Sequence, residues 1–155
     1  AARGEDGAYV ARSFPVPASW RLLFGVPAFE VPTAAARAAL PARCSLAEAS
    51  LTAARAALWV AAVAGDDRAL LRTASLDVLH QPHRAGLVPG LTELLADLRA
   101  AGADAAFLSG AGPTVGAVLG EDALPACREV MTAWVGEGGR VLEPRPATGY
   151  VVERC

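Results

Sequence analysis

Apolar residues in this 155-residue chain occur in two kinds of run, which predict two kinds of element. Short continuous runs are typical of buried strands, and three of them stand at residues 20–26, 105–108 and 115–119. Runs with an apolar residue every three or four positions are typical of helices that bury one side. They occur at residues 45–65, 66–76, 91–101 and 122–135. Shorter stretches of strand character lie at residues 8–12, 140–143 and 150–153.

Cap residues indicate where several helices begin and end. Thr33 precedes the alanine-rich stretch 34–40, so we expect its hydroxyl to cap a helix of about two turns that Pro41 stops. Ser45, with Glu48 three residues later, forms the pattern of a capping box at the start of the longest helix. Residues 77–84 can continue the helix at 66–76 briefly before Pro82 breaks it.

The order of these elements predicts an α+β fold. A strand, several helices, a strand, a turn, a strand, a helix and a strand follow one another. This order is typical of a ferredoxin-like split β-α-β layout, an antiparallel sheet with helices packed on one face.

Composition excludes several classes of function. With 54% hydrophobic and 19% charged residues, the chain is expected to fold and not to be disordered. A net charge of −2 offers no general attraction for nucleic acid or acidic membranes. The longest uncharged apolar run, residues 56–65, is too short to span a bilayer.

All 14 basic residues are arginine, so no lysine of this chain can act as a nucleophile or hold a phosphate. The three cysteines lack any C-x-x-C pairing, which favours reduced thiols in a cytoplasmic protein.

Two arginines are candidates for binding an anion. Arg37 lies in the first turns of the helix at 34–40, where the helix dipole disfavours a cation. It could grip an anion together with backbone N–H groups, or it could be a solvated surface arginine. Arg84 follows Asp77, His80 and His83 within a short stretch. This stretch could form a second anion grip in which Asp77 orients a neighbour, or simply a polar helix end. A metal site there is not expected, because the two histidines lack the usual i, i+4 spacing.

A glycine-rich turn separates the strands at 105–108 and 115–119. Its residues are Ser109, Gly110, Ala111, Gly112, Pro113 and Thr114. The glycines permit positive φ and close approach of the backbone, and Pro113 fixes the exit. The turn could support a phosphate or substrate site, or it could be a plain hairpin. Its spacing is not that of a Walker loop.

Taken in order, these motifs resemble homoserine kinase, a member of the GHMP superfamily of small-metabolite kinases. The resemblance is carried by V-P-T-A-A-A-R-A-A-L-P at residues 31–41, D-V-L-H-Q-P-H-R-A-G-L-V-P at 77–89 and L-S-G-A-G-P-T-V-G-A at 108–117. It implies the C-terminal domain of such a kinase over residues 19–155, preceded by a strand and connector of the N-terminal kinase domain at 1–18. Position by position, Arg37 and Arg84 match two arginines that hold the substrate carboxylate, and Arg37 also lies near phosphoryl transfer. Thr33 lines the same site.

The third motif of the family, which supports the nucleotide and substrate pocket, matches residues 109–113. Ala111 stands where the family typically has serine, a departure between two small residues. Asp77 and His80 are expected to support the site from behind, and no metal ligand is expected in this chain.

The resemblance implies ATP-dependent phosphorylation of the hydroxyl of L-homoserine, on the route to threonine. ATP and Mg²⁺ are then the cofactors, but the phosphate-binding loop and the Mg²⁺-associated acid belong to the N-terminal half of the family. We therefore expect the chain to need that half as a partner, to be inactive alone, and to be cytoplasmic, with a homodimer as a further expectation. Three alternatives stay open: another GHMP kinase, for example one acting on an isoprenoid precursor, a non-catalytic amino-acid-binding module, and an α+β interaction domain without a site.

Overall fold

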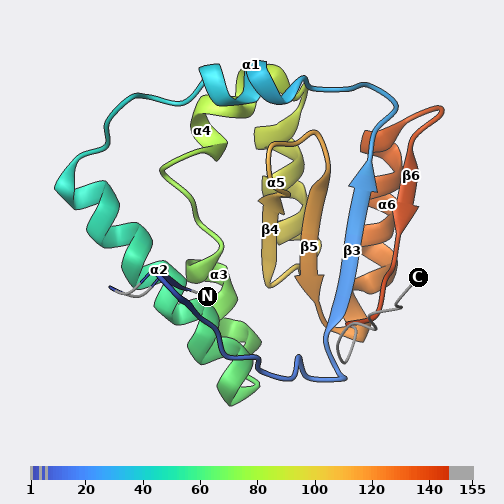
Figure 1. Ribbon diagram of the computed structural model, residues 1–155. Helices are drawn as coiled ribbons and strands as arrows, with labels where there is room; N and C mark the ends of the chain where they lie inside the picture. The colour runs from blue at the N-terminus through green and yellow to red at the C-terminus, as the bar shows by residue number, and fades with distance from the viewer. Residues whose placement is uncertain (1, 4, 6, 147–155) are drawn as a thin grey trace, which may run out of the picture.

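The computed structural model describes residues 2, 3, 5 and 7–146 (Figure 1). Its main sheet has four strands in the order β4-β5-β3-β6, and every neighbouring pair is antiparallel. These strands are β3 (Arg21–Val26), β4 (Ala105–Leu108), β5 (Val115–Leu119) and β6 (Arg140–Leu142). A separate two-stranded ribbon pairs β1 (Ala2–Arg3) with β2 (Tyr9–Val10). The strand predicted at residues 150–153 lies outside the described residues.

The connections confirm the split β-α-β layout. Strands β3 and β4 run in the same direction with β5 between them, and helix α5 (Leu91–Ala100) precedes β4 in the crossover. Helix α6 (Leu124–Val135), after the 3₁₀ turn η3 (Glu121–Ala123), joins β5 to the edge strand β6. The predicted fold class is therefore confirmed, with an antiparallel sheet and packed helices.

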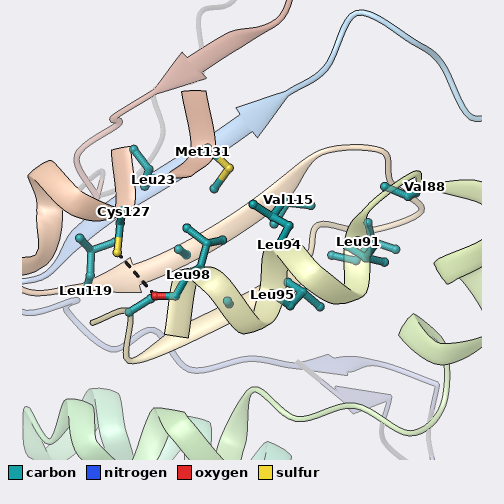
Figure 2. Close-up of a cluster of buried hydrophobic side chains, with 14 of the residues drawn as sticks. Leu23, Val88, Leu91, Leu94, Leu95, Leu98, Val115, Leu119, Cys127 and Met131 are labelled. Atoms are coloured by element: carbon teal, nitrogen blue, oxygen red, sulfur yellow. Dashed lines mark hydrogen bonds between the residues drawn. The ribbon is translucent and has the colours of Figure 1, made fainter. Parts of the chain in front are cut away.

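One face of the sheet is covered by α5 and α6, and the main core lies between them. Leucines at one face of α5, Leu91, Leu94, Leu95 and Leu98, meet Leu23, Val115 and Leu119 of the strands and Met131 of α6 (Figure 2). Burying a leucine fully contributes about 1.5–3 kcal/mol, so this layer supplies much of the stability. Gly25 lets α6 approach β3 closely, because a Cβ there would lie 3.0 Å from Val135 Cγ1.

The other face carries a smaller core that the sequence pattern did not indicate. Helix α2 (Leu46–Gly65) and the short turns η1 (Arg68–Leu70) and α3 (Leu71–Ala74) pack there. Trp20, Ala62 and Leu71 are buried together, and the Trp20 indole donates a hydrogen bond of 2.7 Å to Asp66 Oδ1. Helices α5 and α6 therefore pack on one face of the sheet, as expected. Helices α2 and α3 pack on the opposite face, which was not expected.

Helix α2 begins as predicted and is mostly exposed. The Ser45 side chain accepts from Glu48 N, and the Glu48 side chain accepts from Ser45 N, which confirms the capping box. By length and composition alone α2 could cross a membrane. It contains Arg55, however, and its Trp59 packs on the sheet against Phe107 with ring centroids 5.9 Å apart. These features are those of a helix packed on a folded domain.

Three predictions about helices are wrong. Helix α1 (Thr33–Ala38) has Pro32 at its N-cap, and the Thr33 hydroxyl makes no capping bond. Thr33 is already inside the helix, one position too late to accept from the first free N–H groups. Pro82 does not end a helix either: it lies in the first turn of α4 (Gln81–Arg84), where a missing N–H costs nothing. The helix predicted at 66–76 is only the pair η1 and α3, because the chain turns at Ser75.

Candidate functional site

The side chain of Arg84 joins three segments that are distant in the sequence. Although it is charged, Arg84 is only 8% exposed. Its Nε donates to the carbonyl of Ala36 in α1 at 3.0 Å, and its Nη1 donates to the carbonyl of Gly110 at 3.0 Å. Nη1 also lies 3.4 Å from His80 Nδ1. Helix α1, helix α4 and the loop between β4 and β5 therefore meet at one end of the molecule (Figure 1).

Asp77 fixes the start of α4 and so places Arg84. Its Oδ2 accepts from the backbone N–H groups of His80 at 2.7 Å and Gln81 at 2.6 Å. Burial opposes ionisation of Asp77, but the hydrogen bonds from Gln81 and His80 outweigh it and lower the pKa of this carboxyl. Asp77 is therefore a carboxylate at neutral pH. That it supports a binding site from behind Arg84 stays a prediction.

Gln81 attaches the other side of α4 to the sheet. It is only 7% exposed, and its Oε1 accepts from the backbone N–H of Leu108 at the end of β4. Sequence reasoning did not single out this residue. The signal available was an amide next to Pro82 in a stretch with few other uncharged polar side chains.

His80 lies between Asp77 and Arg84. Burial lowers the pKa of its imidazole; the Asp77 carboxylate opposes that effect, and the Arg84 guanidinium adds to it. We infer that the ring is neutral at pH 7, so it can accept a hydrogen bond from Arg84 or relay one. Within the described residues, no group of three His, Cys, Asp and Glu side chains is arranged to hold a metal ion.

The glycine-rich loop forms a tight turn at the tip of the β4–β5 hairpin. Ser109 N donates to Thr114 O at 2.8 Å, and Gly112 N donates to Ser109 O at 3.1 Å. Gly110 and Gly112 have φ values of 59° and 86°, which only glycine adopts readily, and the Gly112–Pro113 peptide is cis. A Cβ on Gly112 would come within 3.1 Å of Leu108, whereas a Cβ on Gly110 would meet nothing within 4 Å. The loop thus packs on one side and leaves open space at Gly110.

Helix α1 presents Thr33 and Arg37 on its exposed surface and buries Ala36 against the domain. The Arg37 guanidinium makes no hydrogen bond or ion pair with the rest of the described chain. Because Arg84 binds the carbonyl of Ala36, it contacts the backbone of the residue that precedes Arg37. The two predicted arginines therefore belong to segments in direct contact. That their guanidinium groups bind one ligand is a separate proposal, made below.

Comparison with known proteins shows the family to which this fold and site belong. Residues 58–136 match the family model described as GHMP kinases C terminal, which is just over half of the chain. The chain belongs to this family, as the sequence motifs indicated. Its curated relatives include a homoserine kinase from Thermus thermophilus, 44% identical over 91% of this chain and 48% of that protein. Another, from Aquifex aeolicus, is 41% identical over 91% of this chain and 48% of that protein.

A solved structure supports the same relationship. The crystal structure of homoserine kinase from Cytophaga hutchinsonii superposes with a TM-score of 0.82 at 27% identity, covering 91% of this chain and 46% of that one. The chain thus spans about half the length of the relatives it matches, and the family description assigns it to their C-terminal part. What those whole proteins do comes to this chain only as a proposal.

Proposed function

We propose that this chain is the substrate-side half of a homoserine kinase, which transfers a phosphoryl group from ATP to the hydroxyl of L-homoserine. The product is O-phospho-L-homoserine, in the biosynthesis of threonine. The observation that carries the proposal is the position of Arg84, which joins α1, α4 and the glycine-rich loop at one end of the domain. The names of the curated relatives support the choice of substrate.

Arg37 and Arg84 bind the carboxylate of homoserine in this proposal. Two N–H groups of Arg84 are already engaged with carbonyls, which fixes the guanidinium in place, and its Nη2 makes no hydrogen bond within the described residues. A fixed guanidinium loses little entropy when it binds a carboxylate. Arg37, which is exposed and unpaired there, completes the grip, and Thr33 lines the same site on α1. Holding the carboxylate aims the distant hydroxyl at the phosphoryl donor.

The loop at 109–113 supports the pocket for nucleotide and substrate. Its open space at Gly110 and the fixed turn beneath it are consistent with a ligand that approaches the backbone closely. The chain has no lysine and its described residues hold no cluster of metal ligands. We therefore propose that the residues for Mg²⁺ and for the ATP phosphates come from a separate N-terminal half, so that the chain alone is inactive. A cytoplasmic location and a homodimer stay predictions.

Complementation tests this function. The chain is mixed with a separately expressed N-terminal half of the Thermus thermophilus relative, and ADP release is followed in a coupled assay with L-homoserine. We expect release only when both pieces and homoserine are present. Arg37→Gln should abolish it, and Arg43→Gln, an exposed arginine outside the site, should leave it unchanged.

Other outcomes would contradict parts of this proposal. ADP release from the chain alone would contradict the need for a second half. Release with mevalonate in place of homoserine would indicate another GHMP kinase. Tight binding of homoserine to the chain without any release in the complemented mixture would indicate a non-catalytic amino-acid-binding module.

A further inference from the structure

A cavity lies next to the Arg84 site, between α2 and β4. Its volume is about 250 Å³. One wall is a single face of α2, with Thr52, Arg55, Ala56 and Trp59 at spacings of three and four residues. The opposite walls are Phe107 and Leu108 of β4 and the segment from Ser75 to Gln81. We call it the Arg55 cavity.

Three lining residues have buried polar atoms that make no hydrogen bond within the described residues. These atoms are Thr52 Oγ1, Ser75 Oγ, and Nε and Nη1 of Arg55. Ser75 is only 5% exposed. Buried polar groups in folded proteins nearly always have hydrogen-bond partners, and an unpaired one is costly. Four such atoms belong to residues around one cavity, which makes it a candidate binding site.

A hydrogen-bond acceptor that carries negative charge suits these atoms. All of the unpaired atoms can donate a hydrogen bond, because two are hydroxyls and two are N–H groups of a guanidinium. No carboxylate of the described residues forms an ion pair with Arg55. Asp77 also lines the cavity; its Oδ2 accepts from the N–H groups of His80 and Gln81, and its Oδ1 lies 3.9 Å from His80 Nε2. Water would satisfy the hydroxyls, whereas an anion would in addition pair directly with the guanidinium of Arg55.

We propose that the Arg55 cavity binds a compact oxyanion, the carboxylate or phosphate group of a small molecule, through Arg55, Thr52 and Ser75. The cavity is smaller than the pockets of about 300–1,000 Å³ that hold drug-sized ligands, so it suits a smaller molecule. The site is distinct from the proposed homoserine site, because Arg37 and Arg84 are not among its lining residues. It is nevertheless adjacent to that site, since His80 lines the cavity and lies 3.4 Å from Arg84. The inference does not depend on the proposed function.

Nuclear magnetic resonance of the ¹⁵N-labelled chain tests the proposal. The Nε–H signal of Arg55 and the indole N–H signal of Trp59 are followed while inorganic phosphate or acetate is added, with chloride at matched ionic strength as the blank. We expect a saturable shift with a Kd of about 1 mM or tighter for at least one of the two anions. The anion that binds identifies the group as phosphate or carboxylate.

Variants separate this site from general charge effects. Arg55→Gln should weaken binding at least about tenfold, a change of about 1.4 kcal/mol. Ser75→Ala and Thr52→Val, which keep the packing, should weaken it severalfold. Arg72→Gln removes an exposed arginine on the neighbouring α3 and should change nothing. Saturable binding that these cavity variants reduce would support the proposal.

Three results would overturn it. The first is the absence of any saturable shift with either anion. The second is a shift that Arg72→Gln reduces as much as Arg55→Gln does, which would indicate non-specific attraction. The third is loss of the shift in Arg37→Gln with Arg55→Gln unaffected, which would place the anion at the substrate arginines. Circular dichroism of each variant confirms that it is folded before its binding is compared.

Discussion

Replacing Arg84 by alanine should destabilise the domain strongly, before any substrate is added. The substitution removes two hydrogen bonds from a charged donor, to Ala36 O and Gly110 O, each 3.0 Å long. Hydrogen bonds of this kind contribute about 1.5–3 kcal/mol each. Ala36 is fully buried, so its carbonyl would lose its partner without easy access to water, whereas Gly110 is exposed and water can replace the arginine there. We therefore expect a loss of about 3–4 kcal/mol, toward the lower end of the summed range.

Urea denaturation followed by circular dichroism measures this loss. Domains are typically stable by about 5–15 kcal/mol, so the variant should still fold but with a clearly lower midpoint. Arg43→Ala, an exposed arginine in the loop before α2, is the matched control and should change the free energy of unfolding by less than about 0.5 kcal/mol. Arg84→Lys should fall between them, since one ammonium group cannot reach both carbonyls with the geometry of a guanidinium.

A loss below about 1 kcal/mol in Arg84→Ala would refute this reasoning, because it would mean that Arg84 does not join the three segments. The expected loss also bears on the function. Reduced homoserine affinity in Arg84→Ala mixes destabilisation with lost binding, so Arg37→Gln, which alters an exposed side chain, is the cleaner test of the carboxylate grip.

Three further predictions concern the loop, the core and pH. Gly110→Ala should lower the free energy of unfolding in urea by about 1–2 kcal/mol, because the φ of Gly110 is 59°. It should also lower ADP release in the complemented mixture at least about tenfold, because the added methyl group enters the open space of the proposed pocket. Unchanged activity would contradict that placement. Gly25→Ala should lower the unfolding free energy by about 1–3 kcal/mol, because its Cβ would crowd α6, whereas Gly65→Ala, with nothing within 4 Å, should be neutral or stabilising. The pKa values of Asp77 and His80 lie below their ordinary values of 3.8 and 6.5 in the folded chain, so the unfolded chain binds these protons at higher pH. These two groups therefore stabilise the folded state fully when the pH is above their ordinary pKa values, and this stabilisation should be lost as the pH falls through each folded pKa. Asp77→Asn should flatten the acidic part of a plot of urea midpoint against pH.

The elements best predicted from sequence are those whose signals are local. The strands around the glycine-rich loop have the bounds that their apolar runs indicated, Ala105–Leu108 and Val115–Leu119. The capping box of α2 is also confirmed, because both of its partners lie within four residues. The cap at Thr33 failed for a reason that lies in the chain before it: Pro32 has a fixed φ of −57°, and the helix begins one residue earlier than a threonine cap requires.

The candidate site was predictable only in its composition. Arg84 and the loop at 109–114 stand out in the sequence, but their contact depends on a β-hairpin tip lying against α4, which no local pattern encodes. Pro82 was misinterpreted because the same residue type ends one helix and begins another, and only the bonds from Asp77 to the N–H groups of α4 decide which applies. Arg55 was not singled out at all. On α2 it is one charged residue in an alanine-rich helix, and its unpaired atoms become visible only when β4 and Ser75 face it.

The two arginines of the proposed substrate site have different physical roles, and this difference explains why they need not be equally tolerant of change. Arg84 is buried and bound to two carbonyls, so its charge is held at a fixed point whether or not a ligand is present. Arg37 is exposed on a six-residue helix, and its guanidinium makes no hydrogen bond or ion pair within the described residues, so a ligand would have to order it. A carboxylate that meets the fixed charge first would then order the second one. It follows that Arg37→Lys should retain part of the homoserine affinity, since a flexible charge survives exchange for another. Arg84→Lys should lose more affinity, because the bonds that fix the guanidinium are lost with it.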